Sequence, residues 1–423
     1  LKSYHPDWTN DELINQVIGT ADDIDTLNPG YENKLGDGRI NAYHALVDEN
    51  VVPQQELKLE FLSHTVEDEN GNGMIEPEET VSINLEMKNW SQLVNSSDVS
   101  FSLSTIDPDI NIISGTTTVF VPADDAFEIE DAFTFSVNEG ATAHEAVFVV
   151  QVTADVEITY DSEFLLKVLV APSGIFIWDG ELNSPGYSGH FIKQYLNEQG
   201  FDVVYSDFYP PSFAGFDAVF LSFGNGGENT DQAIFFDYPY SLLMQEYLEN
   251  AGKLYVEGMA IMGLPQYFGW ENKTALHDLF GVTNASIGFI SNPISSLEGQ
   301  AGTLAEGIMF TQSNQSQNWY IDQLTPAAGA QVPFVEDNFG NVSVYNEGTA
   351  GHKAFYLGYC LADLVDVDPH SSRYNVLLNM LDFMGYPQGD DYVQANFSQD
   401  KTYILPGEEI QFTDFSVSAE GTS

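Results

Sequence analysis

The residues best suited to chemistry form a run of oxygen ligands at a spacing typical of calcium loops. Residues 68–79 read DENGNGMIEPEE and fit D-x-[DN]-x-[DN]-G-x5-E at each specified position. Calcium binds oxygen ligands on a sharply turning loop, and Gly73 permits that turn. We therefore predict a structural Ca2+ site here. Its expected ligands are Asp68, Asn70, Asn72, the Met74 carbonyl, Glu76 through a water molecule and a bidentate Glu79.

The surroundings of this loop leave an alternative open. Its flanks have the alternating pattern of strands rather than the two helices of an EF-hand, and Pro77 lies inside it. An acidic turn rich in Asn and Gly that binds no ion would have the same composition. The calcium prediction therefore depends on ligand type and spacing.

Neither a disulfide framework nor a zinc site is indicated by the sequence. Cys360 is the only cysteine, so a disulfide framework and a cysteine-based metal site are excluded. It lies in the apolar stretch HKAFYLGYCLADL and is predicted to be a buried packing residue. The eight histidines are scattered and lack the spacing of zinc ligands.

Two hydrophobic patterns predict the elements that position these residues. Over residues 56–171, apolar residues alternate with polar ones between turns rich in Asp, Asn, Gly and Pro, which predicts an antiparallel β-sandwich. Over residues 172–386, continuous apolar strands such as GIFIWDG alternate with helical patterns such as SGHFIKQYLNEQG. This second pattern predicts a doubly wound α/β domain with a mostly parallel sheet.

Residues 1–50 have the pattern of two short amphipathic helices joined by a Gly/Pro loop. Thr9 and Glu12 are spaced as a capping box that opens the first helix. That helix carries Leu13, Ile14, Val17 and Ile18 on one face. So little apolar surface cannot form a core alone, and we expect the segment to dock on another part of the protein.

The same segment resembles the last part of a subtilisin-like serine protease domain. The resemblance lies in LKSYHPDWTNDELINQVIGTADDID, residues 1–25, followed by LGDGRINAYHAL, residues 35–46. In that family the nucleophile lies in a G-T-S-M-A motif before such a segment, and the domain ends in a G-x-G-R-[IV]-[ND]-A helix. The resemblance implies that the catalytic Asp, His and Ser and the oxyanion Asn precede Leu1. It also implies a secreted parent that cleaves peptide bonds through an acyl-enzyme.

The α/β region resembles class I glutamine amidotransferase-like domains in its order of elements and in the stretch YLENAGKLYVEG. Active members place a Cys nucleophile at a strand-to-helix turn. Here the strand that ends at Glu257 continues into GMAIMG, residues 258–263, which contains neither Cys nor Ser. We therefore expect a non-catalytic binding or packing domain.

Further resemblances complete the expected architecture. Loops like residues 68–79 open Ig-like modules of secreted bacterial proteases, and VQANFSQDKTYILPGEEIQFTDF resembles the start of a PKD domain. The expected fold is therefore multidomain. It comprises the C-terminal helices of a subtilisin-like α/β domain (1–50), an Ig-like antiparallel β-sandwich (56–171), a doubly wound flavodoxin- or amidotransferase-like α/β domain (172–386) and a truncated PKD-like β-sandwich (392–423).

The charge of the chain excludes some classes of partner. Its 423 residues include 12 basic and 64 acidic ones, for a net charge of −52. Nucleic acid needs a basic surface and is excluded, and anionic lipid is disfavoured for the same reason. No apolar run has the length of a membrane span, and no signal peptide is visible at Leu1. Such acidity suits a secreted, extracellular protein in saline or calcium-bearing water.

We predict that the chain is the C-terminal part of a secreted subtilisin-like serine endopeptidase, with accessory domains for stability or binding. Two alternatives stay open: a non-catalytic extracellular adhesion or scaffold protein, and a hydrolase that acts through the α/β domain. Protein or peptide substrates would bind the catalytic domain upstream. An extracellular polymer or cell-surface ligand is the other expected kind of partner.

Overall fold

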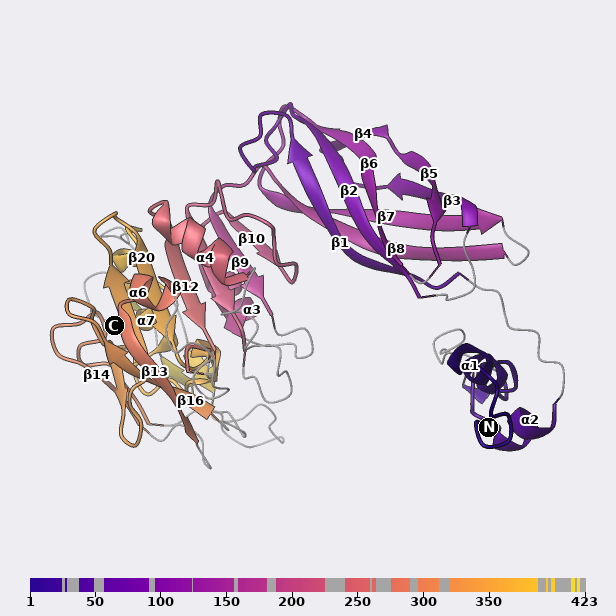
Figure 1. Cartoon of the computed structure of the whole chain (residues 1–423). Coiled ribbons are helices and arrows are strands. Elements are labelled where there is room, and N and C mark those ends of the chain that lie inside the picture. Colours follow the sequence, from indigo (N-terminus) through magenta and orange to yellow (C-terminus); the bar gives the residue numbers. More distant parts are fainter. Residues whose placement is uncertain are drawn as a thin grey trace, which may run out of the picture. The chain divides into compact units, whose positions relative to one another are not determined.

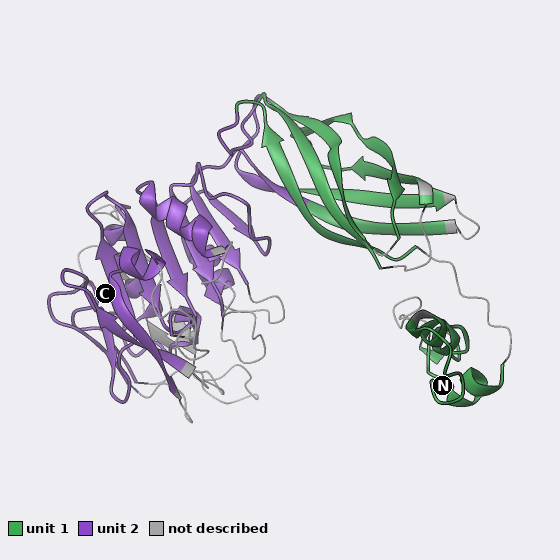
Figure 2. Ribbon diagram, in the orientation of Figure 1, with its two compact units in different colours: residues 1–70, 78–138, 147–166 green, residues 71–77, 139–146, 167–423 purple. Residues whose placement is uncertain are grey.

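The described part of the chain is mostly β-sheet, with several antiparallel sheets and few helices, which agrees with the expected multidomain architecture at this coarse level (Figure 1). By their internal contacts the residues divide into two compact units (Figure 2): unit 1 holds 1–70, 78–138 and 147–166, and unit 2 holds 71–77, 139–146 and 167–423. The computed structural model describes residues 1–24, 27–28, 38–48, 57–90, 96–123, 125–155, 159–180, 188–224, 240–258, 261–263, 275–289, 296–311, 320–386, 393–394, 397–399, 412–414 and 417–418.

Two short helices form the N-terminal segment, α1 (Asn10–Gly19) and α2 (Ala42–Val47). The predicted capping box is present, because the Glu12 amide donates to Thr9 Oγ1 at 3.2 Å and the Thr9 amide donates to Glu12 Oε2 at 2.6 Å. Gln16 joins the two helices by donating from Nε2 to the Ala45 carbonyl at 3.0 Å and to the Asp48 carbonyl at 2.9 Å.

Eight strands form the two sheets of the sandwich. The first sheet has the order β1 (Leu59–Asp68), β2 (Thr80–Asn89), β6 (Ala126–Val137), β4 (Ile110–Ser114). The second has the order β5 (Thr116–Val121), β3 (Ser96–Ser104), β7 (His144–Asp155), β8 (Thr159–Val170). On β2, Val81, Ile83 and Leu85 are each 0% exposed, because alternate side chains of a strand face the core.

Unit 2 is built on a six-stranded sheet with helices on both faces. Its order is β10 (Val203–Ser206), β9 (Ile175–Asp179), β11 (Ala218–Ser222), β12 (Lys253–Glu257), β20 (Lys353–Leu357), β19 (Ser343–Glu347). All neighbours are parallel except β19, which is antiparallel to β20. Helices α3 (Ser188–Glu198) and α7 (Arg373–Phe383) share one apolar cluster with the sheet, and α4 (Tyr240–Glu249) and α6 (Ala275–Leu279) share another.

Short antiparallel strands between β12 and β19 interrupt the α/β alternation, which the sequence pattern did not predict. β13 (Val282–Phe289) pairs with β16 (Tyr320–Pro326). A separate small sheet has the order β15 (Met309–Phe310), β14 (Leu297–Gly299), β17 (Phe334–Glu336), β18 (Gly340–Asn341). Most of these strands have two or three residues, too few to show a period-two pattern in sequence.

Two strand pairs are described near the C-terminal end of the chain. β21 (Val393–Gln394) pairs with β24 (Val417–Ser418), and β22 (Phe397–Gln399) pairs with β23 (Phe412–Asp414), both antiparallel. The rest of the predicted PKD-like segment lies outside the described residues. In the part of the chain that the structure describes, no helix has both the length and the apolar character needed to cross a membrane.

Candidate functional site

The predicted calcium loop connects β1 to β2. Asp68 ends β1 and pairs with Val81, and Thr80 begins β2. Gly71 and Gly73 have φ of 72° and 81°, so both positions use the left-handed conformation that glycine tolerates best. The predicted turn at Gly73 is therefore present.

Two pairs of predicted ligands lie together in this loop. Asn70 Nδ2 donates to Glu79 Oε1, and Asn72 Nδ2 donates to Glu76 Oε2 at 2.8 Å. Asn72 also accepts the Met74 amide at 2.8 Å through Oδ1, which tightens the turn. Glu79 is only 8% exposed. An asparagine side chain can present either its oxygen or its nitrogen, so the same placement lets Asn70 offer its oxygen to a cation.

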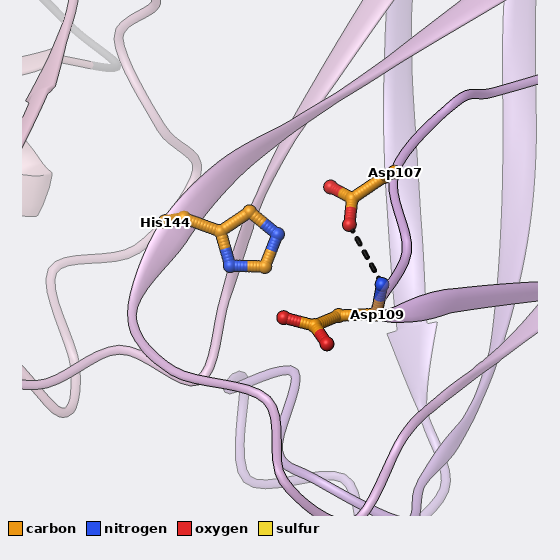
Figure 3. Close-up of side chains that lie close together, drawn as sticks. All are labelled: Asp107, Asp109 and His144. Atoms are coloured by element: carbon orange, nitrogen blue, oxygen red, sulfur yellow. Dashed lines mark hydrogen bonds between the residues drawn. The ribbon is translucent and has the colours of Figure 1, made fainter.

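A second group of potential metal ligands, which no sequence motif indicated, lies in the sandwich. Ligand atoms of Asp107, Asp109 and His144 all lie within 4.8 Å of one another, and this is the one such His, Cys and acidic group in the described ranges. Figure 3 shows the imidazole of His144 beside the two carboxylates. The Asp109 amide donates to Asp107 Oδ1 at 2.9 Å. The only sequence signal is Asp-Pro-Asp, since His144 is distant along the chain; we assign no ion to the group.

In unit 2, polar side chains end three neighbouring parallel strands in the same row. Ser222 on β11 is paired with Asp179 on β9 and with Glu257 on β12. The three residues are 1%, 6% and 0% exposed, respectively. The carboxyl edge of a doubly wound sheet is where such folds bind ligands. Among the described residues, two buried carboxylates and a serine of the protein itself occupy this row.

The Glu257 carboxylate accepts hydrogen bonds from several elements. Ser222 Oγ donates to Oε1 at 2.6 Å, and Tyr255 Oη and the Leu361 amide donate to Oε2 at 2.8 and 2.9 Å. Burial raises the pKa of Glu257, while hydrogen bonds from Ser188 and these donors oppose the rise. A carboxylate with this many donors holds the sheet edge together and has no surface at which to meet a substrate.

The other carboxylate of the row, Asp179, lies against the start of α3. Tyr205 Oη donates to Asp179 Oδ2 at 2.6 Å. A Cβ atom on Gly189 would lie 2.7 Å from the same oxygen, so a larger residue at this position would force Asp179 or α3 to shift. The positive end of the α3 dipole is therefore close to a carboxylate of the protein itself, which disfavours a phosphate there.

The turn after β12, where active amidotransferases carry their nucleophile, is described only in part, and Cys360 lies elsewhere in the fold. Gly258 follows β12 with φ of 146°, and residues 259–260 of the predicted turn lie outside the described residues. Cys360 is 0% exposed and begins the 3₁₀ turn η3 (Leu361–Asp363) after β20. Its burial confirms the prediction of a packing residue, although it lies just past the strand.

A further buried carboxylate, Asp322 on β16, holds the segment after β12. Asp322 accepts the Met262 and Gly263 amides at 2.8 Å each, and also the hydroxyl of Tyr356. Burial raises the pKa of Asp322 to about 6, although these hydrogen bonds act to lower it. No pattern near Asp322 in the sequence indicated this role.

Comparison with protein-family models and with curated protein sequences finds no match. Some solved structures share partial likeness. A conjugative transposon lipoprotein from Bacteroides eggerthii is 17% identical, with 24% of this chain and 94% of that chain covered and a TM-score of 0.14. Beta-glucuronidase 2 from Bacteroides uniformis, as a calcium binding mutant, is 11% identical over 46% of this chain and 23% of its own, with a TM-score of 0.22. These likenesses are too low to support an argument about function.

Proposed function

We propose that this chain is the C-terminal part of a secreted subtilisin-like serine endopeptidase, in which residues 1–50 complete a catalytic domain encoded upstream. The supporting observation is that α1, α2 and their flanks leave large apolar side chains exposed and have almost no core. The resemblance of residues 1–25 and 35–46 to subtilisin-like proteases indicates which kind of domain would cover these side chains.

The exposed side chains are numerous for so short a segment. Among the described residues of 1–48, the one buried apolar side chain is Ala45, at 2% exposure. Several large apolar residues of this segment are between 44% and 74% exposed to solvent: Tyr4, Ile14, Leu27, Ile40, Tyr43, Leu46 and Val47. Fully burying a large apolar side chain stabilises by about 1.5–3 kcal/mol, so a covering domain would gain much from this surface.

The remaining regions would act as accessory domains. We assign the sandwich to an Ig-like module stiffened by calcium at residues 68–79, and the region 172–386 to a non-catalytic amidotransferase-like domain. Residues 392–423 would begin a PKD-like domain. The calcium assignment rests on the ligand types and spacing of residues 68–79, in which Asn70 contacts Glu79 and Asn72 contacts Glu76.

A fluorophosphonate probe, which labels activated serines, tests the proposal. The 423-residue chain should remain unlabelled, whereas the gene product extended upstream of Leu1 should be labelled at one serine. Labelling of the 423-residue chain contradicts the proposal. An unlabelled extended protein also contradicts it, and favours a non-catalytic extracellular scaffold.

Charged substitutions test the covering surface directly. Ile14→Asp and Tyr43→Asp should reduce the folded yield and labelling of the extended protein, because each places a charge in the new interface. Phe120→Asp is the matched control, since Phe120 is 58% exposed on β5 of the sandwich. If the control is as damaging as the two variants, the proposed covering of residues 1–50 is contradicted.

A further inference from the structure

An exposed tryptophan is held in one orientation at the end of β2. Trp90 is 56% exposed. Its Nε1 donates to Glu60 Oε2 at 2.6 Å, and Lys88 Nζ lies 5.0 Å from the ring centroid. The backbone amide of Trp90 donates to the Lys58 carbonyl at 2.9 Å and so continues the strand pairing. The indole is therefore an ordered apolar surface that remains open to solvent.

A polar groove of about 370 Å³ lies across β1, β2 and β6 of the same sheet. Figure 1 shows these three neighbouring strands. Two irregularities in strand pairing lie at the lining residues of the groove. The β1–β2 register shifts between Phe61 and Ser63, and the β2–β6 register shifts between Ile83 and Leu85. Such bulges bend strands and re-aim side chains, and they are common beside binding sites.

Asn84 fixes the shape of the groove at one end. Its Oδ1 accepts the Asp131 amide at 2.7 Å, and its Nδ2 donates to Glu67 Oε1 at 3.2 Å. Asp131 has φ of 45°, which is uncommon for a residue other than glycine. The bulge is thus held by a specific side chain, and the groove is a built feature of the sheet.

The groove extends along β2 towards the tryptophan. Its lining includes Ala126, which is paired with Lys88, and Trp90 is two residues farther along the strand. Two residues of a strand span about 7 Å, so Trp90 lies about 7 Å farther along the strand than Lys88, on the same face of the sheet. From Asn84 to Trp90 the strip is about 20 Å long, which suits a chain of several rings better than one small molecule.

The groups along this strip match the chemistry of a neutral sugar chain. Glu86 and Glu128 face each other across β2 and β6, and Ser63 Oγ donates to Glu86 Oε2 at 2.7 Å. Carboxylates accept hydrogen bonds from sugar hydroxyls, and the hydroxyls of Ser63 and Thr65 can donate or accept. The C–H face of a sugar ring stacks on an indole. The two carboxylates and the net charge of −52 repel anionic ligands.

A basic peptide is the competing occupant of an acidic groove, and the geometry favours it less. Lys88 already lies over the Trp90 ring, so a cationic ligand would meet like charge at the aromatic surface. Three of the groove's polar groups, Ser63, Thr65 and Asn84, are neutral. We propose that the outer face of β1, β2 and β6 binds a neutral oligosaccharide, with Trp90 as its stacking surface and Glu86 and Glu128 as hydrogen-bond acceptors.

Affinity electrophoresis of the full chain tests this site. The gels contain laminarin, mannan, soluble starch or arabinoxylan as neutral polysaccharides, and alginate as the anionic one. At least one neutral polysaccharide should retard the protein, and alginate should not. Trp90→Ala should weaken that binding at least about tenfold, as expected for loss of the aromatic stacking contact. Phe120→Ala is the matched control, because Phe120 is an exposed aromatic residue on β5 of the other sheet, and it should bind normally.

Groove variants separate the sugar from other occupants. Glu86→Gln and Glu128→Gln each change an exposed side chain and should weaken binding while leaving the unfolding midpoint unchanged. The proposal is overturned if none of the four neutral polysaccharides retards the protein, or if Phe120→Ala weakens binding as much as Trp90→Ala. It is also overturned if only oligolysine binds, in a salt-sensitive manner that Trp90→Ala does not alter.

Discussion

Glu79 is the residue on which the calcium proposal can be tested most directly. If calcium binds the folded loop alone, it stabilises the protein by RT ln(1 + [L]/Kd), about 2.7 kcal/mol at a hundredfold excess over Kd. Glu79→Gln removes one carboxylate charge and the bidentate ligand. We therefore expect the variant to lose the calcium-dependent rise in melting temperature, measured by thermal unfolding.

Magnesium is the control for this experiment, because any cation screens the charge of so acidic a chain. Magnesium at the same ionic strength should raise the melting temperature by a smaller amount, and equally in both proteins. Equal effects of calcium and magnesium on the native chain, or an unaltered calcium effect in Glu79→Gln, would show that the loop is a polar turn without a site.

Asp322 should make the free energy of unfolding depend on pH. Its folded-state pKa is raised from 3.8 to about 6 by burial, so the folded protein holds this proton more tightly than the unfolded chain. The stabilising contribution is thus fully present below pH 4 and is lost as pH rises through 6. The change over that range is up to about 3 kcal/mol.

The variant Asp322→Asn isolates this contribution. It should be less stable overall, because its amide group adds donors beside the Met262 and Gly263 amides. Urea unfolding between pH 4 and 7 should show a shallower fall of unfolding free energy with rising pH than in the native chain. Glu130→Gln, an exposed substitution, is the control and should retain the native slope. Parallel slopes for the native chain and Asp322→Asn would rule out this role.

At the scale of elements, the contact between α3 and β9 depends on a glycine. A Cβ at Gly189 would lie 2.7 Å from Asp179 Oδ2 and from its Cγ, closer than real Cβ contacts. Gly189→Ala should therefore push α3 away from the sheet and cost about 1–3 kcal/mol in urea unfolding. Gly140→Ala is the control, since a Cβ there meets nothing within 4 Å. A Gly189→Ala variant as stable as the control would contradict this tight approach.

At the scale of the whole molecule, the net charge of −52 should make stability depend on salt. The folded chain holds its carboxylates closer together than the unfolded chain does, so their repulsion destabilises it. Raising NaCl from 0.01 to 1 M shortens the screening length from about 30 Å to about 3 Å. We expect the melting temperature to rise by several degrees, mostly below 0.2 M because screening saturates. A melting temperature that is flat or falls over this range would contradict the prediction.

Local features of this protein were determined by the sequence alone. The period-two pattern of β2 shows which of its side chains face the core, since alternate side chains of a strand point to opposite faces. The Thr9–Glu12 spacing predicts the cap of α1, because its donors and acceptors lie within one turn. The glycines of residues 68–79 predict the turn between two strands. Each of these depends on neighbours in the chain.

The meeting of distant residues was decided only by the tertiary structure. Parallel pairing through crossover connections places Asp179, Ser222 and Glu257 in one row. Asp322 lies on β16, and it contacts Met262 and Gly263 because the chain folds back to bring β16 beside the segment that follows β12. The groove across β1, β2 and β6 lies where the register shifts in two strand pairings. Strand register and bulges are set by packing across the whole sheet, and no single segment of sequence encodes them.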